Sequence, residues 1–500
     1  MNKKMIAYIT GVLLLCEAVL MLLPLGVAFI YGDKTIPSFL ITIGALCISG
    51  LILISFKPKD KTIYARDGFI IVALGWILLS LLGALPFFIS GEIPNYLNAL
   101  FETVSGFTTT GASILSDVEA LSKSTLFWRS FTHWLGGMGV LVFMMAVLPL
   151  AGGGGDLHLM KAESPGPSVG KLVPKSNKTA RILYYIYIAL TVACMIFLKL
   201  GGMSIFESVT LSFGTAGTGG FGIVNDSFAS YSPYCQTVVT VFMTLFGVNF
   251  NLYFLLLFRK FKEALKCEEV WVYLGIFTTA AIAIALNIYN QFGSFSVALR
   301  HAAFQVSAVM TTTGFSTTDF NQWPEFSRTI MIMLMCVGAC AGSTGGGFKI
   351  SRVIILLKNA AKECRSLSHP RSVKVLKFEG SRVKDETIRS TSAYLVIYVF
   401  IFCISVVILS LDKTDMLTNI TSTISALNNI GPNLGPRLAE GVQPGYGAGG
   451  PFSNYGTFSS LSKIVLIFDM LLGRLELFPI IVLLTPSKKL RNKLSTRKGL

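Results

Sequence analysis

The chain has 500 residues, of which 52% are hydrophobic and only 14% are charged, and its net charge is +16. A soluble domain carries about 25% charged residues, so this composition excludes an ordinary soluble protein and predicts a polytopic membrane protein. The apolar segment 6–30 is too long for a secretory signal and has no small-residue cleavage site. We therefore expect it to be the first membrane span.

The basic residues are confined to alternate loops of a ten-span arrangement. They lie at 3–4, 57–66, 161–181, 259–266, 349–389 and 488–498. Because cytoplasmic loops are enriched in Lys and Arg, this placement predicts that these loops and both termini are cytoplasmic. The positive charge therefore indicates orientation in a membrane rather than a nucleic-acid partner.

Two leading spans, 6–30 and 37–56, are followed by four similar units. Each unit is predicted to contain a span, a half-helix that ends in a turn, and a second span. The spans match a hydrocarbon core of about 30 Å, whereas the half-helices are too short to cross it and are predicted to be re-entrant. In that order the units are 68–90, 96–109 and 126–150; 182–200, 205–216 and 234–258; 270–289, 297–312 and 328–357; 391–411, 416–429 and 461–484.

A polar turn that contains glycine follows every half-helix. Polar backbone between membrane spans is costly unless it lines a watery cavity, and four such turns can surround a cation with backbone carbonyls. We interpret Gly111, Gly219, Gly314 and Gly431 as one equivalent position, with hydroxyls from Thr110, Thr218 and Thr313 beside it. The candidate filter comprises Thr109, Thr110, Gly111, Thr218, Gly219, Gly220, Thr312, Thr313, Gly314, Ile430, Gly431 and Pro432.

Potassium is the cation that such a filter suits, because carbonyl oxygens can replace the water shell of a large monovalent ion. The half-helices end at the turns, so their negative dipole ends favour a cation there. The alternative is four unrelated glycine turns in loops. The run Gly217 to Gly222 also matches the dinucleotide fingerprint G-x-G-x-x-G, but the strand that this fingerprint requires in front of it is absent.

The predicted fold is an all-α membrane protein with two leading transmembrane helices and four membrane–pore–membrane repeats around a central ion pore. Each repeat crosses the membrane an even number of times, so the repeats are parallel and related by an axis along the membrane normal. The leading helices occupy 1–64, and the repeats occupy 65–155, 156–266, 267–385 and 386–500.

A glycine-rich stretch interrupts the second span of the third unit. Three consecutive glycines cannot be stable helix, since each costs about 1 kcal/mol relative to alanine. We predict a flexible polar loop below the filter that gates the pathway; the alternative is a closely packed helix kink. This loop comprises Ala341, Gly342, Ser343, Thr344, Gly345, Gly346, Gly347 and Lys349.

Charged residues within spans are the remaining candidates. An intramembrane arginine is costly unless it is paired or faces water, so Arg474 is predicted to face the pore below the filter and to associate with the gate. The alternative is a structural ion pair. Glu102 and Glu207 are interpreted as matching positions in two half-helices that add negative potential near the ion entry. For His133, a structural role is favoured over proton transfer.

These motifs together resemble the Trk/Ktr/HKT superfamily of potassium transporters, and within it the bacterial Trk branch. The resemblance covers essentially the whole chain. It rests on Thr-Thr-Thr-Gly-Ala at 108–112, Gly-Gly-Phe at 219–221, Thr-Thr-Thr-Gly-Phe at 311–315, Ala-Gly-Ser-Thr-Gly-Gly-Gly-Phe-Lys at 341–349, Trp-Leu-Gly-Gly-Met-Gly at 134–139 and Gly-Arg-Leu-Glu-Leu at 473–477.

The resemblance implies K⁺ uptake across the bacterial inner membrane by a homodimer with one pore per subunit, surrounded by membrane lipid. It also implies a cytoplasmic regulatory partner of the TrkA type, which binds NAD(H) or ATP/ADP, so that no nucleotide cofactor is expected in this chain. By motif position it carries the filter glycines to Gly111, Gly219, Gly314 and Gly431, the gating loop to 341–348, and the gate-associated arginine to Arg474.

Three functions remain to be weighed. A gated, K⁺-selective channel-like uptake protein is favoured, because a symporter that couples K⁺ to Na⁺ or H⁺ should show an intramembrane carboxylate or histidine as its coupling site, and candidates are few. A membrane enzyme would need a catalytic cluster. The four histidines, at 133, 158, 301 and 369, are scattered without a paired motif, so an enzyme is not expected.

Overall fold

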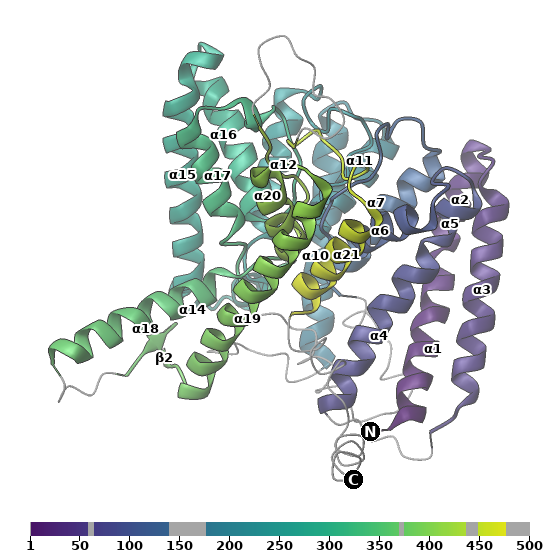
Figure 1. Ribbon diagram of the computed structural model, residues 1–500, viewed down its shortest axis with the longest axis horizontal. Helices are drawn as coiled ribbons and strands as arrows, with labels where there is room; N and C mark the ends of the chain where they lie inside the picture. Colours follow the sequence, from purple (N-terminus) through teal and green to yellow (C-terminus); the bar gives the residue numbers. More distant parts are fainter. Residues whose placement is uncertain (1, 59–64, 140–176, 370–374, 437–448, 477–500) are drawn as a thin grey trace.

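The computed structural model describes residues 2–58, 65–139, 177–369, 375–436 and 449–476. This part of the chain is mostly helical with almost no strand (Figure 1), which confirms the predicted all-α class. Its strands are β1 (Lys377–Phe378) and β2 (Ser381–Arg382), which form one short antiparallel hairpin. His158 and the basic segment 488–498 lie outside the described residues.

The leading hairpin consists of α1 (Lys3–Leu20), α2 (Leu22–Tyr31) and α3 (Ile36–Ser55) at one edge of the molecule (Figure 1). Gly11 and Gly50 let α1 and α3 approach closely, because a Cβ built on Gly11 would lie 2.7 Å from the Gly50 carbonyl oxygen. Small residues at such crossings are typical of helix packing in membranes. The outward side of α3 exposes Ile48 and Leu51, as a lipid-facing surface would.

The four units follow in the predicted order, and the four half-helices lie where the sequence placed them. Unit one comprises α4 (Ala65–Gly83), α5 (Leu85–Ile89), α6 (Tyr96–Phe107) and α7 (Lys123–Gly137). Unit two comprises α10 (Asn177–Leu200), α11 (Ile205–Gly217), α12 (Pro233–Phe246), α13 (Phe250–Leu257) and α14 (Phe261–Ala264). Unit three comprises α15 (Glu268–Phe292), α16 (Phe295–Met310), η2 (Phe320–Gln322), α17 (Glu325–Met335) and α18 (Ile350–Ser368). Unit four comprises α19 (Asp385–Leu409), η3 (Ser410–Asp412), α20 (Met416–Asn428) and α21 (Ser460–Leu475).

Within the described residues, six helical segments are long and apolar enough to cross a membrane. They are Lys3–Tyr31, Ile36–Ser55, Arg66–Ile89, Arg181–Leu200, Glu268–Phe292 and Asp385–Asp412. The helices α12 and α13 pass the same test only when taken together, and their axes differ by 87°. These segments make the chain a multi-pass membrane protein.

In each unit, the helix that follows the half-helix is shorter than the second span predicted there. The expected interruption of 328–357 is confirmed, since α17 ends at Met335 and α18 begins at Ile350. The predicted span 234–258 is divided into two helices, because the chain turns at 247–249 between α12 and α13. In units one and four the helices end at Gly137 and Leu475, and the rest of 126–150 and 461–484 lies largely outside the described residues.

The break in unit two is stabilised by the interruption in unit three. The Cys340 amide donates to the Gly247 carbonyl at 3.1 Å, and the Phe250 amide donates to the Gly342 carbonyl at 3.0 Å. Non-helical backbone at membrane depth needs such partners, because no bulk water is available to it. The two breaks therefore satisfy each other's backbone hydrogen-bonding groups. Neither sequence segment alone predicted this contact.

Candidate ion pathway

All four half-helices end in the same unusual backbone conformation. The first residue of each turn has a positive φ: Thr109 at 56°, Thr218 at 53°, Thr312 at 60° and Asn429 at 55°. A β-branched residue rarely adopts this conformation, and such strain persists where the surrounding structure imposes it, often at functional sites. The shared conformation identifies four equivalent turns.

Two residues later, each turn has a glycine with a positive φ. These glycines are Gly111 at 80°, Gly220 at 77°, Gly314 at 84° and Gly431 at 100°. The prediction that Gly219 matches the other three was therefore wrong by one residue. The reason is that Thr218 ends α11 and corresponds to Thr109 rather than to Thr110. The repeated Gly-Phe pair at 220–221 and 314–315 is the signal that identifies the right register.

The four glycines close a ring in which each faces a carbonyl of the next unit. A Cβ on Gly431 would lie 2.7 Å from the Thr110 carbonyl oxygen, so unit four meets unit one. A Cβ on each of the other three glycines would overlap a carbonyl oxygen: Gly111 that of Gly219, Gly220 that of Thr313, and Gly314 that of Ile430. Only glycine fits these positions, because any side chain would collide with the backbone of the neighbouring unit.

Hydroxyls behind the ring are held in fixed hydrogen bonds. The Thr108 hydroxyl donates to the Val104 carbonyl at 2.7 Å and lies 2.8 Å from the Thr110 hydroxyl. Unit three repeats this arrangement, with the Thr311 and Thr313 hydroxyls 2.7 Å apart. The side-chain amide of Asn429 then donates to the Thr110 hydroxyl at 2.9 Å. Units one and four therefore share a buried polar contact, and unit three repeats the hydroxyl pair of unit one.

The segments after the filter are held from the half-helices in three units. The residue seven positions before the positive-φ residue is polar in each: Glu102, Gln305 and Ser422. Glu102 accepts from the Ser113 hydroxyl at 2.9 Å and from the Ile114 amide at 3.0 Å. Gln305 donates to the Thr318 carbonyl at 3.3 Å, and Ser422 accepts from Asn433 at 2.9 Å.

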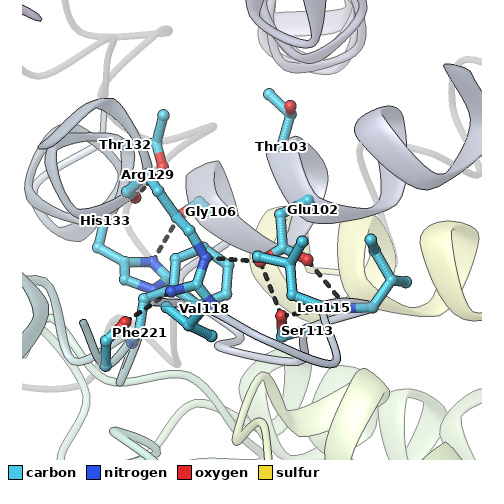
Figure 2. Close-up of polar contacts among 12 residues, drawn as sticks. Glu102, Thr103, Gly106, Ser113, Leu115, Val118, Arg129, Thr132, His133 and Phe221 are labelled. Carbon is cyan, nitrogen blue, oxygen red and sulfur yellow. Dashed lines mark hydrogen bonds and ion pairs between the residues drawn. The ribbon is translucent and has the colours of Figure 1, made fainter. Parts of the chain in front are cut away.

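Unit two has Leu211 at this position, and unit one supplies the support instead. Arg129, on α7, pairs with Glu102 at 2.6 Å and donates to the Gly222 carbonyl at 2.7 Å, while its guanidinium lies 3.6 Å from the centre of the Phe221 ring. Figure 2 shows this guanidinium between Glu102 and the filter segment of unit two. Arg129 was not identified from the sequence.

His133, one turn further along α7, completes this support. Its Nδ1 donates to the Gly106 carbonyl at 2.8 Å, which leaves Nε2 to accept from the Phe221 amide at 3.2 Å (Figure 2). The ring joins the half-helix of unit one to the filter of unit two. A structural role for His133 agrees with the sequence interpretation.

The expected roles of Glu102 and Glu207 were wrong. Glu102 is 1% exposed and its charge is compensated by Arg129, so it does not present a charge at the ion entry. Glu207 lies eleven residues before Thr218 and so does not correspond to Glu102. It forms a capping box with Ser204 at the start of α11, where a carboxylate satisfies the first backbone amides.

The glycine-rich segment of unit three contacts the filter ends of units three and four. The Gly346 amide donates to the Thr312 hydroxyl at 2.6 Å, and a Cβ on this glycine would lie 2.6 Å from the Asn428 carbonyl oxygen. Lys349 is 2% exposed and donates to the Gly345 carbonyl. The segment is thus placed directly against two of the four turns.

Arg474 connects this segment to unit one. Its guanidinium donates to the Thr344 carbonyl at 2.9 Å, to the Thr109 hydroxyl at 3.3 Å and to the Gly137 carbonyl at 3.0 Å, and it also bonds the Gly136 carbonyl. Glu476 pairs instead with Arg352 at 2.6 Å. One side chain therefore contacts the filter end of unit one, the end of α7 and the glycine-rich segment.

Glu269 is a further residue that the sequence analysis missed. It is fully buried at the start of α15, and one carboxylate oxygen accepts from the Ala341 amide at 2.7 Å and from the Ser351 amide at 3.1 Å. These two amides flank the glycine-rich segment. The sequence does show a carboxylate in the first turn of an apolar helix, which could have marked Glu269 as unusual. Its partners could not be recognised, because they are more than 70 residues away in the chain.

These observations define a multi-pass helical protein whose four units meet in one ring of backbone. A family model described as a cation transport protein, TrkH, matches residues 37–270 and 264–493. The chain belongs to this family, as the resemblance predicted.

Two sets of relatives agree with that assignment. The potassium uptake proteins TrkH of Salmonella typhimurium and of Escherichia coli K12 are each 34% identical to this chain, over 97% of its length and 99% of theirs. The crystal structure of the potassium transporter TrkH from Vibrio parahaemolyticus matches with a TM-score of 0.84 at 32% identity, covering 97% of this chain and 99% of that one. These relatives are named as transport proteins, not as enzymes.

Proposed function

We propose that the chain is a gated, K⁺-selective uptake protein in which K⁺ passes the ring formed by the four turns. The observation that carries this proposal is the closed succession of glycines and carbonyls, with Gly431 of unit four against Thr110 of unit one. Backbone carbonyls arranged around one axis can replace the hydration shell of K⁺. The relatives named above are potassium uptake proteins.

In this proposal the glycine-rich segment 341–349 is the gate and Arg474 holds it closed. The support is that Arg474 joins Thr344 to Thr109 and to the end of α7. Opening then requires these hydrogen bonds to break together. The repeats are taken as 65–155, 156–266, 267–385 and 386–500, after the leading helices at 1–64.

The family also suggests the surroundings of the protein. We propose a homodimer in the bacterial inner membrane with both termini cytoplasmic, and a nucleotide-binding regulatory partner of the TrkA type on the cytoplasmic side. α18 projects away from the helix bundle beside the β hairpin (Figure 1), and a cleft of about 560 Å³ lies between α18 and α19. This projecting region is available for the partner.

The test is the reversal potential in liposomes under K⁺/Na⁺ bi-ionic gradients, for the wild type and for Gly111→Ser. We expect the wild type to reverse near the K⁺ equilibrium potential and the variant to lose this preference, because the new Cβ overlaps the Gly219 carbonyl oxygen. Gly293→Ser is the matched control, since Gly293 also has a positive φ of 66° but has no atom within 4 Å of the added Cβ.

A symporter coupling K⁺ to Na⁺ or H⁺ is the alternative function. Current that follows a Na⁺ or proton gradient at fixed stoichiometry would overturn the channel proposal in its favour. Equal preference for K⁺ over Na⁺ in Gly111→Ser and in the wild type would show that K⁺ does not pass through the ring.

A further inference from the structure

A carboxylic acid lies at the centre of the first membrane span. Glu17 is the middle residue of the helical segment Lys3–Tyr31, fourteen residues from either end. It is 3% exposed, and neither of its carboxyl oxygens has a hydrogen-bond partner among the described residues. An ionisable residue inside a membrane is costly and is a candidate functional site for that reason.

The carboxyl group faces the half-helix that leads to the first filter turn. A Cβ built on Gly83 of α4 would lie 2.9 Å from a Glu17 carboxyl oxygen, 3.0 Å from the Phe107 ring and 3.2 Å from the Thr103 methyl carbon. Phe107 is the last residue of α6, immediately before the turn that contains Thr109 and Gly111. Glu17 therefore sits in the wall directly behind the filter of unit one.

Two donors that border this space are already used in other hydrogen bonds. The Thr103 hydroxyl donates to the Ala99 carbonyl at 2.8 Å, and the Trp128 indole donates to the Gly83 carbonyl at 3.0 Å. The other atoms that border the space beside Gly83 are carbon atoms, of the Phe107 ring and the Thr103 methyl group. Hard metal cations bind several oxygen ligands, which this surrounding does not offer, whereas a proton needs only the carboxylate itself.

Among the described residues, no charged side chain forms a hydrogen bond with Glu17. On α6 and α7 the charges beside Thr103 and Trp128 are Glu102 and Arg129, which pair with each other; Figure 2 shows Thr103 projecting away from that pair. α3 carries no charged residue, and the remaining charges of α1 and α4 lie in their first turns, at Lys3, Lys4, Arg66 and Asp67. The contact of Arg474 with α4 is made to Trp76, whose ring centre lies 5.9 Å from the Arg474 guanidinium carbon.

We propose that Glu17 is a proton-binding site whose neutral form supports the first half-helix, so that proton loss lowers K⁺ flux. A buried carboxylate without partners is strongly unfavourable, so the packed arrangement requires the proton. When the proton leaves, the charge next to Phe107 draws water or moves α1 away from α6, and the turn at Thr109 loses its support. This inference rests on the proposed K⁺ pathway.

The site modulates the flux and does not carry protons across the membrane. Among the described residues, no hydrogen bond links the Glu17 carboxyl group to the turn at Thr109 or to the pair of Glu102 and Arg129. We therefore expect pH to change the size of the K⁺ current and to leave its reversal potential unchanged.

The experiment measures K⁺ current in proteoliposomes at a series of equal internal and external pH values. The wild-type current should fall as pH rises, approaching a tenfold decrease per pH unit, the slope of a single proton site. Glu17→Gln, which imitates the protonated form, should keep the high current at every pH, and so should Glu17→Met. Glu386→Gln is the control, because Glu386 is an exposed carboxylate at the start of α19, and it should retain the wild-type profile.

A second readout reports on the proton directly. Infrared difference spectra of the full-length protein should contain a protonated-carboxyl carbonyl band that is absent from Glu17→Gln. The proposal is overturned if this band does not depend on Glu17, if Glu17→Gln keeps the wild-type pH profile, or if a pH gradient shifts the reversal potential in a Glu17-dependent way. Loss of K⁺ preference over Na⁺ in the wild type would instead overturn the proposed function.

Discussion

The candidate filter turn of unit two is supported differently from those of the other three units. Units one, three and four hold the segment after the filter with a polar side chain from their own half-helix, namely Glu102, Gln305 and Ser422. Unit two has Leu211 in that position, fully buried in an apolar cluster. Its filter segment is held from unit one, by Arg129 and His133.

This difference shows how four repeats can keep one backbone geometry with unequal side chains. The four turns share their φ values within a narrow range, although the contacts behind them differ. The ring requires that the segment after each turn be fixed by hydrogen bonds, and these bonds can come from the same unit or from the neighbouring one. A consequence is that units one and two are coupled through Arg129, which pairs with Glu102 in unit one and donates to the Gly222 carbonyl in unit two, so a change in one unit should reach the other.

Arg129→Leu should produce the largest effect, because it removes the support of unit two and leaves Glu102 buried without its counter-charge. Removing one partner of a buried ion pair costs about 3–5 kcal/mol. We expect a matching loss of thermal stability in detergent and a loss of K⁺ preference over Na⁺, measured by the bi-ionic reversal potential.

The control is Lys260→Leu, which removes an exposed ion pair with Glu263 and should change stability by less than about 1 kcal/mol. The double variant Arg129→Leu with Glu102→Gln should recover part of the stability, since the uncompensated charge is gone. K⁺ preference that survives in Arg129→Leu would show that unit two needs no support from unit one.

Much of this architecture follows from the sequence, because it depends on local pattern. Apolar length and charge predicted the leading spans, and the turn motifs placed the half-helices within about two residues of their observed ends, the usual uncertainty of helix boundaries. Repetition of the motif located the glycine turns, but of the two consecutive glycines in unit two the prediction chose Gly219, whereas Gly220 has the positive φ of the other three. That choice depended on which residue ends α11, and Thr218 does so in a conformation that threonine rarely adopts.

The supporting residues could not be predicted in the same way, because their partners are distant in the chain. Arg129 and Gly222 are 93 residues apart, and Glu269 and Ala341 are 72 apart. The break at Gly247 was missed for the same reason, since its free backbone groups bond to the segment around Cys340 and Gly342. The sequence pattern showed which charged or polar residues are energetically costly in a membrane, but not which partners offset that cost.

Leu211→Gln should have a smaller effect, which tests whether the two kinds of support are interchangeable. The new amide takes the position of Gln305 in unit three and can reach the backbone after Gly220. In the wild-type background we expect little gain, because Arg129 already occupies the Gly222 carbonyl. In the Arg129→Leu background it should restore about 1 kcal/mol, the worth of one hydrogen bond, together with part of the K⁺ preference. Leu211→Met is the control for the change in shape, and an equal recovery in both variants would refute the exchange of support.

Asp117→Ala should have the smallest effect, although Asp117 also joins units one and two. Its carboxylate accepts from the Asn225 side chain at 2.9 Å, at the outer end of the two filter segments, but it is fully exposed to water. The hydrogen bond from Asn225 holds the pKa of Asp117 below its ordinary value. This contact therefore stabilises the folded protein at pH values above the ordinary aspartate pKa. The stabilisation is lost as the pH falls through the lower pKa that Asp117 has in the folded protein. At neutral pH we expect unchanged K⁺ preference and a change in current within about twofold, because exposed contacts contribute little. A loss of selectivity comparable to that of Arg129→Leu would show that the outer contact, and not the buried pair, couples the two units.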